Sequence, residues 1–79
     1  MLIARKLFDN FLDATDAKKK EYVYELAAID LDEATALMAN LYEAVFGDYP
    51  TGLVATFMEQ HLKDKVFQRM VKANQFAAA

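Results

Sequence analysis

The acidic residues Asp30, Asp32 and Glu33 are close enough in the sequence to suggest a metal or acid–base site. A calcium loop counted from Asp30 would need a Gly at its sharp turn and a Glu at its twelfth position, and this stretch has neither. The start of a helix also attracts negative charge, because its first backbone N–H groups have no partner within the helix. We therefore expect these carboxylates to cap a helix, and we predict no metal site.

Nucleophilic and cofactor chemistry have little material in this chain. It contains no Cys and no Ser, and His61 is its single histidine. Its two glycines bracket a turn and do not form a phosphate-binding loop. A helical di-iron site would place an acidic residue three positions before the histidine, where this chain has Met58. We expect His61 to be partly buried and hydrogen-bonded, and we predict no enzymatic activity and no cofactor.

The length of 79 residues predicts a single helical domain, residues 1–79, with a modest core. Chains of this size are usually supplemented by disulfides, a metal or oligomerisation, and the absence of Cys removes the first. No apolar run approaches the roughly 18 residues of a membrane span, and charges interrupt the N-terminal segment where a signal peptide would be apolar. We expect a cytoplasmic protein with no membrane partner, stabilised by self-association or by a protein partner.

The net charge of −3 conceals three segments of different charge. Residues 1–20 carry five basic and three acidic side chains, 21–62 carry eight acidic and none from Lys or Arg, and 63–79 carry four basic and one acidic. Either the basic ends fold back onto the acidic middle, or the acidic middle faces a protein partner with a basic surface. We expect no nucleic-acid binding, because the acidic middle would repel phosphate and the last four basic residues spread around their helix.

Apolar residues recur at helical spacing along most of the chain and predict an all-α fold. We expect a small antiparallel bundle of four helices, or of three plus one, with a longer C-terminal helix. The predicted helices span 2–14, 17–29, 31–46 and 52–73, with Gly47 ending the third. The predicted core contains the following residues: Leu7, Phe8, Phe11, Val23, Leu26, Leu37, Leu41, Val45, Phe57 and Leu62.

Residues 21–27 fit two kinds of secondary structure. Val23 and Leu26 suit the inner face of a helix, whereas Tyr22, Tyr24 and Leu26 would alternate along a strand. No second strand or hairpin signal lies nearby, and this favours the helix. On that helix Tyr24 points away from the core, where an interface residue would lie.

Two families of small helical proteins resemble parts of this pattern. The length, the acidity and the four predicted helices are similar to those of acyl carrier proteins, which carry a prosthetic arm on a Ser that this chain lacks. The residues YPTGLV at 49–54 resemble the corresponding region of the colicin immunity proteins, which are small, acidic and four-helical. That resemblance covers six of 79 residues and lacks the tyrosine pair of the family, so it illustrates a class and assigns no membership.

The apolar stripe of the last predicted helix changes sides part-way along the helix. Successive residues of a helix are about 100° apart, so Val66 and Met70 lie off the centre of the face that Met58 and Leu62 occupy. Phe67 and Val71, one turn apart, fall on yet another side. Either the helix bends near its lysines to follow a curved core, or its second half contacts something other than its own bundle. We favour the second interpretation, because three shorter helices do not easily cover a straight helix of this length.

These observations predict a non-enzymatic protein–protein interaction module, an adaptor, inhibitor or assembly subunit, that forms a homodimer or higher homo-oligomer through its C-terminal helix. The predicted interface residues are Val66, Phe67, Met70, Val71, Tyr24, Glu25, Asp32 and Glu33. Phe67 and Met70 are expected at its centre, with Phe76 assisting. Two alternatives stay open: a nucleic-acid-associated regulator that uses the terminal basic segments, and an enzyme subunit completed only in an oligomer.

Overall fold

The computed structural model describes residues 2–78 of the chain, and the side chains of residues 3–73. Every regular element in that range is an α-helix: α1 spans Leu2–Ala14, α2 Ala17–Ile29, α3 Leu31–Phe46 and α4 Gly52–Ala78. The predicted all-α fold is confirmed, as are the bounds of the first three helices. The ambiguous segment 21–27 lies within α2 and is helical. The fourth helix continues past residue 73, where we expected it to end.

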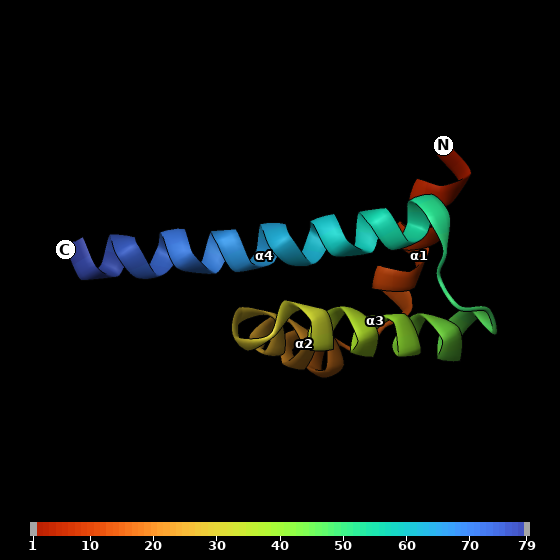
Figure 1. Cartoon of the computed structure of the whole chain (residues 1–79), viewed down its shortest axis with the longest axis horizontal. Coiled ribbons are helices and arrows are strands. Elements are labelled where there is room, and N and C mark those ends of the chain that lie inside the picture. Colours follow the sequence, from red (N-terminus) through yellow and green to blue (C-terminus); the bar gives the residue numbers. More distant parts are fainter. Residues whose placement is uncertain (1, 79) are drawn as a thin grey trace.

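α4 runs along the longest dimension of the molecule and contacts each of the other three helices (Figure 1). α2 and α3 pack against each other as a hairpin on one side of it, and α1 packs against α4 and α3. The C-terminal turns of α4, drawn in blue, extend past the connection between α2 and α3 with no other helix beside them. No helix in the described part of the chain combines the length and the apolar composition needed to cross a membrane.

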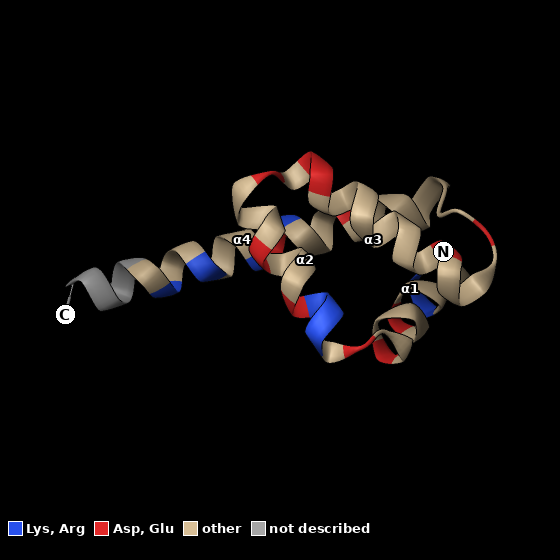
Figure 2. Ribbon diagram, turned by 90° about the horizontal axis from the view of Figure 1, so that it is seen from below, with Lys and Arg blue, Asp and Glu red and all other residues tan. Residues whose placement is uncertain are grey.

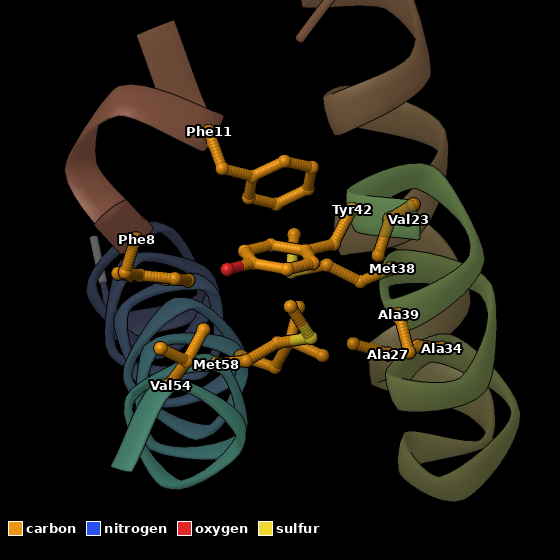
Figure 3. Packing of buried hydrophobic residues seen from close by; sticks show 11 residues of the cluster. Phe8, Phe11, Val23, Ala27, Ala34, Met38, Ala39, Tyr42, Val54 and Met58 are labelled. Carbon is orange, nitrogen blue, oxygen red and sulfur yellow. The ribbon is translucent and has the colours of Figure 1, made fainter. Parts of the chain in front are cut away.

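The core is a cluster of small and flexible side chains around a few aromatic rings (Figure 3). Phe11 of α1 packs on Tyr42 of α3 with ring centroids 5.4 Å apart. Met38 of α3 and Met58 of α4 fill the space between their helices, and both are fully buried. Within residues 3–73, the buried residues that form this cluster are Phe8, Phe11, Val23, Ala27, Ala34, Met38, Ala39, Tyr42, Val54, Met58 and Leu62.

The predicted core is confirmed at its centre and wrong at two positions. Four predicted residues, Phe8, Phe11, Val23 and Leu62, are buried. Four others, Leu26, Leu37, Leu41 and Phe57, are partly buried and pack against the cluster. The side chains of Leu7 and Val45 are exposed, contrary to the prediction. Val45 lies on the same side of α3 as Leu41, but α2 begins opposite Leu41, so α2 does not cover the next turn of α3.

The helix ends follow the cap chemistry of the sequence. Asp16 accepts hydrogen bonds from the backbone N–H groups of Lys18 and Lys19 at the start of α2. Asp30 accepts one from the N–H of Glu33 at 3.2 Å, as expected for the start of α3. Gly47 ends α3 in the left-handed conformation at φ 81°, a region that other residues rarely adopt. The acidic cluster at residues 30–33 therefore has a structural role in the fold.

Candidate functional site

The second half of α4 exposes large apolar side chains to solvent. Phe67 lies nine residues after the buried Met58, which is about two and a half helical turns, so the two side chains point in opposite directions. Phe67 is 66% exposed, Met70 59% and Val71 39%. These three residues, hereafter the apolar strip, lie at the helical spacing i, i+3 and i+4 and share one face. The change of sides expected from the sequence is present in the structure, on a continuous helix.

Val66 has a different role from the one predicted for it. It is half-buried and packs against the core cluster, so it belongs chiefly to the bundle and not to the strip. Together with Ala27 and Leu31 it lines a hollow of about 230 Å³, and Phe67 and Met70 form the outer wall of that hollow. The apolar strip is therefore continuous with an apolar depression at the junction of α2, α3 and α4. The side chain of Phe76, expected to assist, lies outside the described residues.

The sequence suggested that Tyr24 points away from the core. In the structure it points toward α4 instead. Its hydroxyl lies 2.8 Å from Nε2 of His61, and both rings are half-buried at the crossing of α2 and α4. Burial raises the pKa of Tyr24, with a further contribution from the negative charge of Glu21. Burial lowers the pKa of His61, assisted by the positive charge of Lys65. A protonated tyrosine can donate to the unprotonated Nε2, so this pair is most stable when both rings are neutral.

The prediction for His61 as a partly buried, hydrogen-bonded histidine is confirmed. The edge of the Phe8 ring packs against it at 5.4 Å between centroids. The hydroxyls of Thr15, Thr35 and Thr56 each donate to the backbone carbonyl four residues earlier. The arrangement around His61 thus orients α2 relative to α4 by packing and one side-chain hydrogen bond.

The basic residues of α4 are less scattered than the sequence suggested. Lys65, Arg69 and Lys72 face one cavity of about 400 Å³ beside Tyr24, whereas Lys63 lies on another side and pairs with Glu59. Within that cavity Arg69 forms an ion pair with Glu21, and the Lys65 ammonium lies 5.2 Å from the centroid of the Tyr24 ring. One basic end therefore folds onto the acidic middle at this point. Exposed pairs of this kind contribute roughly 0–1 kcal/mol each.

The three acidic residues of the predicted interface lie on α2 and α3, whereas the apolar strip lies on α4. Glu25 is exposed on α2, and Asp32 and Glu33 are exposed in the first turn of α3. Figure 2 shows acidic residues at the connection between α2 and α3, among other places, and basic residues along α4 and at the start of α2. Glu33 lines a hollow on the outer side of the α2–α3 pair, and Asp32 lines another between α3 and α4. Neither of these two hollows is lined by a residue of the apolar strip.

A groove between α2 and α3 was not predicted from the sequence. Two adjoining hollows of about 370 and 380 Å³ share Tyr22 and Leu37. The rest of their apolar lining is Leu41, Leu26 and Ala36, and the charged residues of the lining are Lys18, Lys19 and Glu33. We name these two hollows together the seam groove. Its signal in the sequence is a pair of i, i+4 repeats, Tyr22 with Leu26 and Leu37 with Leu41. The three leucines of these repeats were predicted to be core residues.

Among the described residues, no three side chains of His, Asp or Glu are grouped as a metal ion would require. Comparison with protein-family models, with curated proteins and with solved structures gives no match. The surface of this chain offers three features that could bind a partner: the apolar strip, the seam groove and the basic residues of α4.

Acidification should destabilise the protein through His61. The pKa of this residue is lower in the folded state than its ordinary value of 6.5, so the unfolded chain binds the proton more readily. The contribution of His61 to stability is fully present above pH 6.5 and is lost as the pH falls below that value. Urea unfolding at a series of pH values should show this decrease, and a His61→Gln variant should show a smaller one. An equal pH dependence in both proteins would contradict the assignment.

Proposed function

We propose that this protein is a non-enzymatic protein–protein interaction module that self-associates through the C-terminal half of α4. The observation that carries the proposal is the apolar strip, three large side chains on a helix that continues beyond the rest of the bundle. Large apolar side chains contribute about 1.5–3 kcal/mol each when they are fully buried. Because a chain of 79 residues has a small core, the burial of these side chains would add a large share of its total stability.

The charge distribution supports a second copy as the partner. Within residues 63–73, α4 carries four basic side chains and one acidic. Residues 21–46, which cover α2 after its first turn and all of α3, carry six acidic side chains and none from Lys or Arg, whereas residues 18–20 at the start of α2 are lysines. Two copies thus offer surfaces of opposite sign to each other, and such complementarity favours association and its rate. An adaptor, inhibitor or assembly role would use the same surface and would add a further protein to it.

Replacing Phe67 by Asp should abolish self-association without unfolding the protein. The substitution places a charge at the centre of the apolar strip, where a partner would have to bury it unpaired. Because Phe67 is mostly exposed in the single chain, far-ultraviolet circular dichroism should report unchanged helicity. Sedimentation velocity of the variant should give a monomer at concentrations where the unmodified protein forms a dimer.

Gln60→Asp is the matched control for that experiment. Gln60 lies seven residues before Phe67, about two helical turns earlier on the same side of α4, and it is also exposed. The Gln60→Asp substitution adds the same charge to the same face of α4, but at a position beside the bundle and outside the apolar strip. Dimerisation should survive this change. Equal loss of association in both variants would mean that charge on α4, and not the apolar strip, is responsible.

A further inference from the structure

The seam groove has the form that a docked helix requires. Its wall is formed by the half-buried Leu26, Leu37 and Leu41 and by Tyr22, which is 59% exposed. The groove runs along the contact between two helices and is open to solvent along that side. Amphipathic helices bind such grooves through side chains spaced i, i+3 and i+4. The apolar strip of α4 has that spacing, with Phe67 first.

The apolar strip alone is too small to hold two copies together. A whole aromatic side chain buries about 150–250 Å², so the strip in its present exposure offers roughly 300 Å² per copy, and two facing strips about 600 Å². Stable, specific interfaces bury about 1,200–2,000 Å² in total. A second apolar surface of similar size must take part if the dimer is stable. If the groove offers about the same apolar area as the strip, one contact between a strip and a groove buries about 600 Å². The two such contacts of a reciprocal pair then bury about 1,200 Å².

The charges around the groove differ between its two ends. Lys18 and Lys19 line the end near the start of α2, and Glu33 lines the other end. The helix that bears the strip is basic, so its Lys and Arg side chains are expected to lie toward Glu33 and away from the two lysines. Glu33 lies at one end of the groove, where a basic side chain of an incoming α4 could reach it. Strip and groove lie on different parts of one chain, so each copy supplies both halves of the contact.

We propose that the apolar strip of one copy occupies the seam groove of a second copy, and that the exchange is reciprocal. The pair closes on a two-fold axis, because each chain donates one strip and accepts another. Phe67, Met70 and Val71 of each chain contact Tyr22, Leu37 and Leu41 of the other. This proposal depends on the proposed self-association and specifies which surface α4 meets.

A mixing experiment distinguishes this arrangement from direct pairing of the two strips. The groove is disabled by Tyr22→Asp and, independently, by Ala36→Glu; both residues are exposed, and both line the groove. The strip is disabled by Phe67→Asp. Each variant alone should self-associate at least about tenfold more weakly than the unmodified protein. A mixture of Tyr22→Asp with Phe67→Asp retains one intact strip and one intact groove, so the two variants should associate with each other more strongly than either does with itself, and more weakly than the unmodified protein does.

The heterodimer is detected by sedimentation of one fluorescently labelled variant in an excess of the other. Tyr49→Asp is the control, because Tyr49 has similar exposure, at 51%, and lies outside the groove. If both groove variants dimerise as strongly as the unmodified protein, the inference is wrong, while the proposed self-association through α4 stands. If the unmodified protein is monomeric at every concentration, the proposed function itself fails.

Discussion

Replacing Phe11 by alanine is expected to lower the free energy of unfolding by about 3–5 kcal/mol. Phe11 is fully buried, and its ring packs between Phe8 of its own helix, at 6.4 Å between centroids, and Tyr42 of α3, at 5.4 Å. α1 is held by its contacts with α3 and α4, so the cavity would open where the helix is attached. Small domains have only about 5–15 kcal/mol of total stability, and this variant should be close to unfolding at room temperature.

Equilibrium unfolding in urea, followed by circular dichroism, measures this effect. The matched control is Phe67→Ala at a protein concentration where the chain is monomeric. It removes the same side chain from a position that is 66% exposed, so the expected change is within about 0.5 kcal/mol. A loss of less than about 1 kcal/mol for Phe11→Ala would show that the packing of α1 contributes little to the fold.

Enlarging Ala34 to leucine should also destabilise the protein, by about 1–3 kcal/mol or more. Ala34 is fully buried on α3, and Ala27 of α2 is buried in the same cluster. Such small side chains allow helices to approach closely, and the added carbon atoms would force the helices apart or into strained rotamers. Thermal and urea unfolding should both report the change.

Ala44→Leu is the control for that prediction, because Ala44 is on the same helix and exposed. It should change the free energy of unfolding by no more than about 0.5 kcal/mol. If Ala34→Leu proved as stable as this control, the packing around Ala34 would have to be looser than the structure indicates.

The sequence predicted the helices well because their local signals are strong. Asp30 and Gly47 mark the two ends of α3 by cap chemistry that depends only on neighbouring residues. The large core residues Phe8 and Leu62 were correctly placed by helical periodicity. Small buried residues such as Ala34 carry no comparable signal, because alanine is common on either face of a helix.

The surface was harder to predict, since it depends on where neighbouring helices begin and end. Tyr24 fits the outer face of an isolated α2, yet α4 crosses α2 there and supplies His61 as its hydrogen-bond partner. Leu37 and Leu41 have core periodicity, but only part of each side chain is covered, so they form a groove. Phe67 was correctly expected outside the bundle, because its angular position relative to Met58 follows from helix geometry alone.

The most direct test of the central claim is the mass of the unmodified protein in solution. The mass of one chain is 9.0 kDa. Sedimentation equilibrium over a range of protein concentrations should give an average mass that rises from that of one chain toward that of two, because the strip on α4 is buried only in the pair. Raising the salt concentration should shift the rise to higher protein concentration, since opposed charges support the contact. A mass equal to one chain at every concentration would contradict self-association through α4.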